Sequence, residues 1–172
     1  MGAMLIRGRS GWRILGFLAT FVVLELSWEA ARGTALERLV IHDATVRSAT
    51  FLINALTPAL AAQASESSIR AAGGGLNIRN GCEGLEVLFL LTAAFVVAPV
   101  PWRQRAAGLL LGTALIYVAN EARIVGLFYA YRSDPALFDQ LHSTVTPVAM
   151  ILIVAFYFYA WLDRTRRSMA AA

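Results

Sequence analysis

Four apolar stretches dominate this chain, and each approaches the roughly 20 residues that a helix needs to cross a lipid bilayer. The stretches are residues 14–28, 85–100, 106–131 and 145–162. The last one ends in an aromatic cluster of the kind that lies at a lipid–water boundary. We therefore predict an all-α fold, a multispan integral membrane helix bundle with about four transmembrane helices in one domain.

The composition excludes the main alternatives to a membrane protein. Of the 172 residues, 58% are hydrophobic and 15% are charged, whereas a soluble domain has about 45–50% apolar and about 25% charged residues. This much apolar material also excludes a disordered chain. Cys82 is the only cysteine, so a disulfide framework is excluded as well.

The arginines indicate how the spans are oriented. Eight of them flank the apolar stretches on one side, where Asp163 is the single acidic residue; they are Arg7, Arg9, Arg13, Arg103, Arg105, Arg164, Arg166 and Arg167. The opposite side carries most of the acidic residues. The positive-inside rule therefore places residues 1–13 and 163–172 in the cytoplasm.

Residues 30–81 are expected to form one extracytoplasmic segment that is partly amphipathic and lies on the membrane. Within it, residues 49–62 are apolar, but they are short for a span and contain Asn54 and Pro58. That length suits an interfacial or re-entrant segment, although the sequence leaves a fifth span open. Residues 14–28 are expected to be an uncleaved anchor, because no clear signal-peptide cleavage site follows them.

The sequence contains no motif for a metal, a cofactor or a nucleic acid. No His/Cys/Asp/Glu cluster has metal-ligand spacing, and no Gly-rich loop fits a nucleotide-binding pattern. The arginine clusters are short and flank spans, so orientation explains them better than nucleic-acid binding does. We expect no cofactor, no metal and no nucleic-acid partner.

Cys82 lies at the outer mouth of the stretch 85–100. A single extracytoplasmic cysteine suggests a reactive thiol or an intermolecular disulfide. The start of a helix stabilises a thiolate through its unpaired N–H groups and its dipole, and Gly81 and Gly84 leave room for a substrate backbone. The alternative is a small buried apolar residue, a common role for cysteine.

Arg123 lies inside the stretch 106–131. A charge there costs about 2.5–3.5 kcal/mol to insert and marks a functional site by default. Its long side chain can extend toward the outer surface, and Asn120, three residues earlier, lies on the same helix face. The alternative is an Arg–Glu pair that fixes helix packing; the neighbouring Glu121 points to another face.

His142 precedes the stretch 145–162, and the topology returns it to the outer side. A lone histidine in a loop is usually an ordinary surface residue, but here three reactive groups from successive spans converge on one boundary. Together they suit acyl transfer by a thiol, with Cys82 as nucleophile and His142 as general acid and base. Arg123, helped by Asn120, would stabilise the oxyanion.

On these residues the sequence resembles the exosortase/archaeosortase family of membrane transpeptidases. The resemblance rests on Cys82-x-Gly84, on Asn120-x-x-Arg123 and on His142 before the last span. It covers roughly half of the chain, and its three motifs occur in the family's order.

The length of the chain is similar to that of the compact bacterial members, such as the exosortase H type. One position departs from the family pattern: Thr146 stands four residues after the histidine, where a small residue, often glycine, is common.

The resemblance implies a substrate, a reaction and a location. Family members cleave exported proteins that carry a C-terminal signal of a short motif, a hydrophobic helix and a basic cluster, and pass the new carboxyl end to an acceptor. For this chain it implies a multi-pass protein of the bacterial cytoplasmic (inner) membrane, whose active site faces away from the cytoplasm and forms a thioester on Cys82. The motif, the acceptor and the oligomeric state stay open.

Two other functions also stay open. One is a non-enzymatic membrane assembly or scaffold protein, in which Cys82 is a packing residue. The other is an intramembrane cysteine protease that hydrolyses its substrate without transferring it. The resemblance favours the transpeptidase over both.

Overall fold

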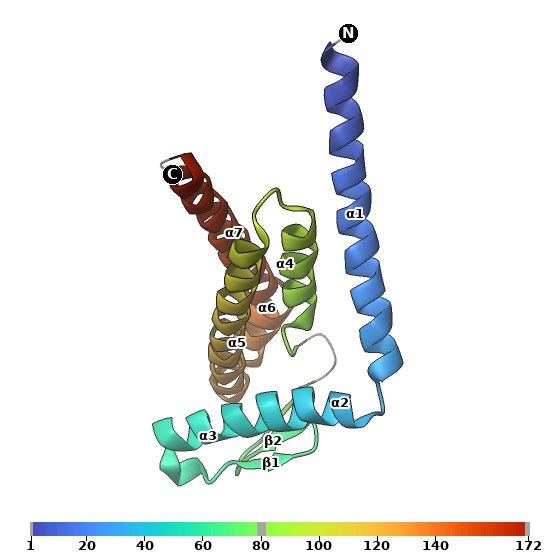
Figure 1. Ribbon diagram of the computed structural model, residues 1–172. Helices are drawn as coiled ribbons and strands as arrows, with labels where there is room; N and C mark the ends of the chain where they lie inside the picture. The colour runs from blue at the N-terminus through green and yellow to red at the C-terminus, as the bar shows by residue number, and fades with distance from the viewer. Residues whose placement is uncertain (1, 79–81, 171–172) are drawn as a thin grey trace.

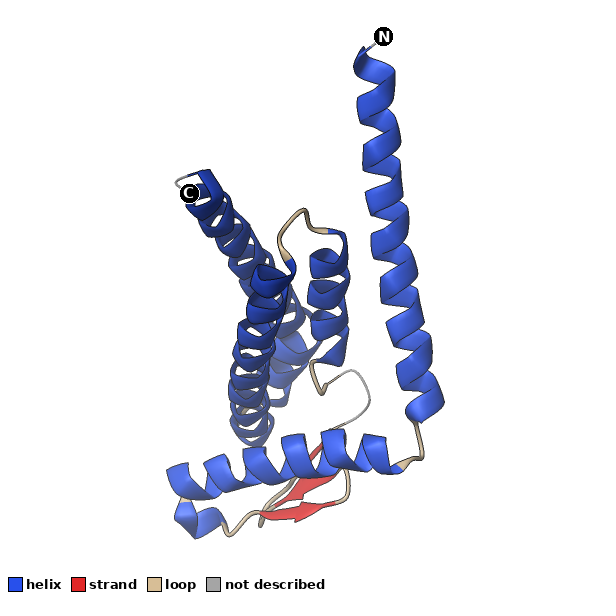
Figure 2. Ribbon diagram, in the orientation of Figure 1, coloured by secondary structure: helices blue, strands red, loops and turns tan. Residues whose placement is uncertain are grey.

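The computed structural model describes residues 2–78 and 82–170, and this part of the chain is mostly helical (Figure 1, Figure 2). Three helical segments in it are long and apolar enough to cross a membrane: Gly11–Ala31, Trp102–Ser133 and Pro135–Ala170. A shorter apolar helix, α4, covers Leu85–Val97. The prediction of a multispan helical membrane protein is confirmed.

The helices extend beyond the apolar stretches that predict them. Helix α1 covers Gly2–Ala31, α5 covers Trp102–Ser133 and α7 covers Thr146–Ala170. The short helix α6 (Pro135–Gln140) and the π-helix η3 (Leu141–Val145) lead directly into α7. The added turns at the helix ends contain polar residues, so a search for apolar stretches does not include them in the helices.

The helices place the two ends of the chain at the same end of the bundle. In Figure 1 both termini and the loop between α4 and α5 lie toward the top, while the start of α4 and the end of α5 lie toward the bottom. We call this lower end the distal end. It holds the start of α4, where Cys82 lies, and the end of α5.

Two glycines on α5 allow the bundle to pack closely. A Cβ atom on Gly108 would lie 2.6 Å from Phe95 Cζ, and one on Gly112 would lie 2.8 Å from Tyr157 Cε1 and also meet Leu91. The two glycines form a Gly-x-x-x-Gly pattern, which brings helix backbones close together in membranes. Helix α5 therefore packs directly against α4 and α7.

A second layer covers the distal end. Helix α2 (Ala35–Glu37), the π-helix η1 (Arg38–Val46) and α3 (Arg47–Leu56) form a continuous rod that runs from the lower end of α1 beneath the other helices (Figure 1). A short 3-10 turn, η2 (Pro58–Leu60), follows the rod. The apolar stretch 49–62 thus ends in a turn, and α3 with its ten residues is not among the helices long enough to span.

A small antiparallel sheet lies against this rod, with strands β1 (Gln63–Ser65), β2 (Ser68–Arg70) and β3 (Leu76–Asn77) in the order β1-β2-β3 (Figure 2). Its Ile69 packs with Val46 and Ile53 of the rod and with Phe128 of α5 in one buried cluster. The sequence pattern did not predict the sheet, because strands of two or three residues are too short to show alternation. Strand β3 of this sheet forms one wall of the site described below.

We predict that a large side chain at Gly112 disrupts the bundle. Gly112→Leu should lower the free energy of unfolding in detergent by about 1–3 kcal/mol or more, because the new side chain overlaps Leu91 and Tyr157. Gly126→Leu is the matched control, since a Cβ on Gly126 meets nothing within 4 Å. Thermal unfolding of the two purified variants measures the difference, and equal stabilities would contradict close packing at Gly112.

Candidate active site

A cavity of about 270 Å³ at the distal end holds two of the residues singled out from the sequence, Cys82 and His142. Its other described walls are Leu76, Asn77, Ile78, Ile124, Leu127 and Phe138. The cavity therefore lies between strand β3 on one side and helices α5 and α6 on the other. It brings together a thiol and an imidazole that are 60 residues apart in the chain.

The backbone of Cys82 is held by Asn120 from α5. Asn120 is 2% exposed, and its Nδ2 donates a hydrogen bond to the carbonyl oxygen of Cys82 over 3.1 Å. Gly84 makes this contact possible: its φ of 80° is left-handed, and a Cβ there would lie 3.0 Å from Asn120 Cγ. The two sequence motifs Cys82-x-Gly84 and Asn120-x-x-Arg123 thus meet in one contact.

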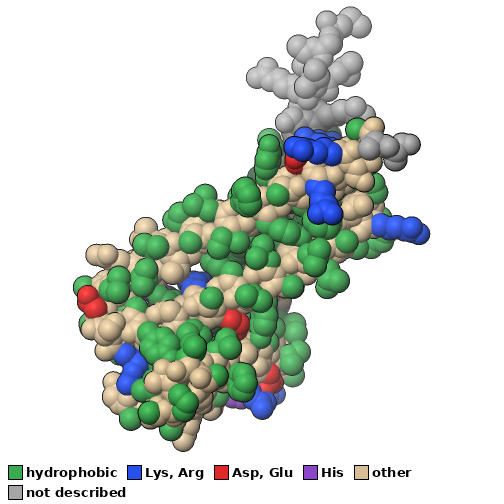
Figure 3. All heavy atoms as spheres, turned by 90° about the vertical axis from the view of Figure 1, so that its left-hand side faces the viewer, with side chains coloured by type: hydrophobic (Ala, Val, Ile, Leu, Met, Phe, Trp, Pro, Cys, Tyr) green, Lys and Arg blue, Asp and Glu red, His purple; other side chains and the backbone are tan. Residues whose placement is uncertain are grey.

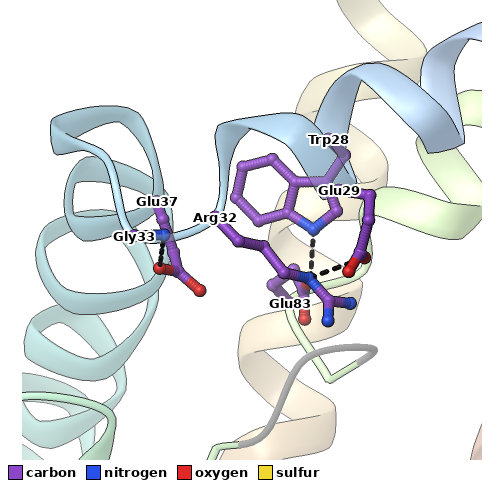
Figure 4. Close-up of polar contacts among 6 residues, drawn as sticks. All are labelled: Trp28, Glu29, Arg32, Gly33, Glu37 and Glu83. Carbon is purple, nitrogen blue, oxygen red and sulfur yellow. Dashed lines mark hydrogen bonds and ion pairs between the residues drawn. The ribbon is translucent and has the colours of Figure 1, made fainter.

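Helix α1 holds the residue that follows the cysteine. The buried Trp28 donates from Nε1 to a carboxylate oxygen of Glu83 over 3.1 Å. Figure 4 shows Trp28 and Glu83 side by side at the end of α1, beside the ion pair of Arg32 with Glu29 at 2.9 Å. The sequence analysis missed Trp28, because nothing in a lone tryptophan at a helix end indicates its distant partner.

His142 lies in the π-helix η3, with its ring stacked on Phe138 at a centroid distance of 5.3 Å and an interplanar angle of 6°. Phe138 in turn meets Tyr131 of α5 edge to face. Among the residues that the structure describes, none hydrogen-bonds the imidazole nitrogens, so packing rather than a polar partner orients the ring. π-Helical turns occur frequently at functional sites.

Arg123 lies beside the cavity rather than among its lining residues. Its Nε donates a hydrogen bond to Thr146 Oγ1 over 2.9 Å, and Thr146 follows His142 by four residues. Arg123 shares a face of α5 with Asn120, which holds Cys82, and with Leu127, which lines the cavity. Among the described residues no ion pair joins Arg123 to Glu121. Glu121 is instead buried, with Ser48 of α3 beside its carboxylate.

Thr146 explains how an arginine is accommodated inside a span. Its hydroxyl accepts from Arg123 and donates to the carbonyl oxygen of Leu141, five residues earlier. The hydroxyl therefore both accepts and donates a hydrogen bond, and the π-turn that carries His142 is tied to α5. From the sequence, Thr146 stands out only because it departs from the family pattern, and its contact with Arg123 was not predicted.

A second, larger cavity of about 1010 Å³ adjoins the first on the other side of β3. Its wall includes Arg32 from the turn after α1, Arg38 from η1 and Glu66 from the turn between β1 and β2. It shares Asn77 and Ile78 with the cavity of Cys82. Over residues 2–78 and 82–170, no group of three or more His, Cys, Asp or Glu side chains is close enough to bind a metal ion.

The comparisons with known proteins identify one family. A family model described as transmembrane exosortase (Exosortase_EpsH) matches residues 1–161. Searches of curated proteins and of solved structures find no match.

We predict that a methyl group at position 84 displaces Asn120. Gly84→Ala should destabilise the protein more than Gly33→Ala, although both glycines have a left-handed φ. The left-handed conformation costs alanine about 1–2 kcal/mol at either site, but only Gly84 abuts another side chain, since a Cβ on Gly33 meets nothing within 4 Å. Unfolding midpoints in detergent measure both losses. Equal losses would show that the contact between Gly84 and Asn120 carries no stability.

Proposed function

Because the chain belongs to the transmembrane exosortase family, we propose that it is a cysteine transpeptidase. It cleaves the C-terminal sorting signal of exported proteins through a thioester and transfers the new carboxyl end to an acceptor. The observation that carries this proposal is the cavity shared by Cys82 and His142, because a thiol attack on a peptide needs a proton acceptor within reach of the sulfur.

The first half of the reaction forms the thioester. His142 takes the proton of the Cys82 thiol, and the sulfur forms a bond to the carbonyl carbon while the carbonyl electron pair moves onto oxygen. Arg123 stabilises that oxyanion with the guanidinium nitrogens that Thr146 leaves unused. When the oxyanion collapses, the carbon–nitrogen bond breaks, and His142 returns its proton to the leaving amine.

The second half resolves the thioester. A nucleophile of the acceptor gives its proton to His142 and attacks the thioester carbonyl, and the carbon–sulfur bond then breaks. The thiolate of Cys82 leaves and recovers its proton from His142. Atoms and electrons balance without an oxidant or a metal ion, so the reaction requires only the acceptor as a co-substrate.

The shape of the helix bundle supports a substrate whose tail is itself a membrane helix. An apolar hollow of about 210 Å³ lies between α1, α4 and α7, lined by Phe17, Leu91, Val154 and their neighbours. Helix α4, which lines this hollow, begins beside Cys82. A helix that packs here would present the residues before it to the cavity of Cys82.

The sidedness of the molecule supports an active site on the extracytoplasmic face. The described arginines at the end that holds the α4–α5 loop and the end of α7 are accompanied by a single acid, Asp163. Figure 3 shows basic side chains at both ends of the molecule, together with most of the visible acidic ones at the distal end, and apolar side chains over the helices between them. Cys82 lies at the opposite, distal end. With the arginine-rich end in the cytoplasm, the site faces outward from the bacterial inner membrane.

We predict that processing of an exported substrate requires both Cys82 and His142. Cys82→Ala should abolish the thioester and lower the processing rate by about 10³-fold or more, and His142→Ala should lower it by about 10²–10⁴-fold. Ser143→Ala is the matched control on the same turn. Co-expression with a substrate, followed by mass spectrometry of its new C-terminus, measures cleavage and separates transfer from hydrolysis. Normal processing by Cys82→Ala would refute the proposal.

We also predict that Thr146 acts by positioning Arg123. Thr146→Val keeps the size of the side chain but removes the hydroxyl, and should lower kcat about tenfold with little change in KM, whereas Thr146→Ser should restore most of kcat. Thr144→Val controls for a substitution in the same turn. In an Arg123→Ala background, Thr146→Val should add little further loss. A full tenfold loss in that background would contradict a role through Arg123.

A further inference from the structure

Strand β3 is an edge of the sheet, and the register shows where its backbone groups point. In the antiparallel pair with β2, Ile78 opposes Ser67 and donates its N–H to the Ser67 carbonyl oxygen over 2.7 Å. Hydrogen-bonded and non-hydrogen-bonded positions alternate along such a pair. Asn77, one residue before Ile78, therefore directs its own N–H and C=O away from β2, toward the open edge.

This open edge borders the candidate active site. Asn77 and its two neighbours line the cavity that holds Cys82 and His142. Asn77 and Ile78 also line the larger polar cavity on the other side. Within the part of the chain that the structure describes, the backbone of Asn77 makes no hydrogen bond, so a donor and an acceptor lie side by side next to the nucleophile.

We infer that β3 binds the substrate as an added strand. The segment of the sorting signal next to the bond that is cut lies extended along β3 and forms two main-chain hydrogen bonds with Asn77. One end of the segment reaches Cys82, and the other extends toward the polar cavity. Strand addition of this kind draws its affinity from main-chain bonds and its selectivity from pockets for alternate side chains. The inference rests on the proposed function.

Two features of the strand agree with this role. At two residues β3 is too short to pair extensively with other chains, which limits the tendency of exposed edges to aggregate. It is also held in place from two sides. Ile69 of β2 is fully buried in the core, and Arg132 of α5 donates to the carbonyl oxygen of Gly74 in the turn before β3 over 3.0 Å. A firmly held edge loses little freedom when a peptide binds.

The first test removes one of the two backbone groups. Asn77→Pro lacks the N–H that faces the edge and leaves the ladder with β2 intact, the situation in which edge strands accept proline. Asn77→Ala, which keeps the N–H, is the comparison. The probe is a fluorescent peptide copied from the stretch upstream of the terminal span of an exported protein that the wild-type enzyme cleaves. Binding is measured on the Cys82→Ala protein, and the Kd with Asn77→Pro should exceed that with Asn77→Ala about tenfold.

The second test changes the peptide, so it does not depend on how well the proline variant folds. A single N-methyl group is placed at each residue of the probe in turn, and one position should raise the Kd about tenfold on the protein with Asn77. On the Asn77→Pro protein, the same methyl group should raise the Kd little further, because both changes interrupt the same hydrogen bond. A Kd that is insensitive to every methyl group and to proline would overturn strand addition.

The outcomes separate this inference from the proposed function. If Cys82→Ala abolishes processing while proline and N-methylation leave the Kd unchanged, strand addition fails and the transpeptidase stands. If Cys82→Ala still processes the substrate, the proposed function itself fails. If β3 pairs instead with a second copy of this chain, Asn77→Pro lowers the mass of the purified protein in light scattering and leaves the Kd unchanged, which also overturns the inference.

Discussion

The hydrogen bond from the Asn120 amide to the carbonyl oxygen of Cys82 determines where the thiol lies. It joins the middle of α5 to the turn before α4, two segments that the chain itself links only through the loop at the other end of the bundle. The bond is buried, where an unsatisfied carbonyl is costly and a made bond is strong. Gly84 is part of the same interaction, since any larger residue there would push Asn120 away from the turn.

Close packing of α5 against α4 and α7 gives that bond a rigid base. Gly108 and Gly112 bring the helices together near the arginine-rich end, while Asn120, Arg123 and Leu127 face the site farther along α5. One helix thus supplies packing contacts in its first half and polar contacts in its second. Helix α1 adds a further support through Trp28 and Glu83, so the turn that carries Cys82 is held from two helices that are not neighbours in the sequence.

Much of the architecture could be predicted because apolar length is a local property. The stretches 14–28, 106–131 and 145–162 all lie within helices, and the one near 85–100 forms the shorter α4. The convergence of Cys82 and His142 was also predictable, because alternating spans place both residues at the same boundary. The β-sheet could not be predicted, since its two- and three-residue strands form only against the buried cluster around Ile53 and Phe128, which is a tertiary interaction.

Arg123 could be singled out from the sequence, but its contact could not. A charged residue inside a span suggests a functional site. The group that forms a hydrogen bond with it, however, can lie on any neighbouring helix. Thr146, at the start of α7, is that group. Its hydroxyl accepts a hydrogen bond from the Arg123 guanidinium and donates one to the carbonyl oxygen of Leu141 in the π-turn. A regular α-helix would offer that hydroxyl the carbonyl of residue 142 instead, one residue later. His142 in this π-turn lines the cavity, and the hydroxyl that binds the turn also binds Arg123. One threonine thus links the segment of His142 to the side chain of Arg123.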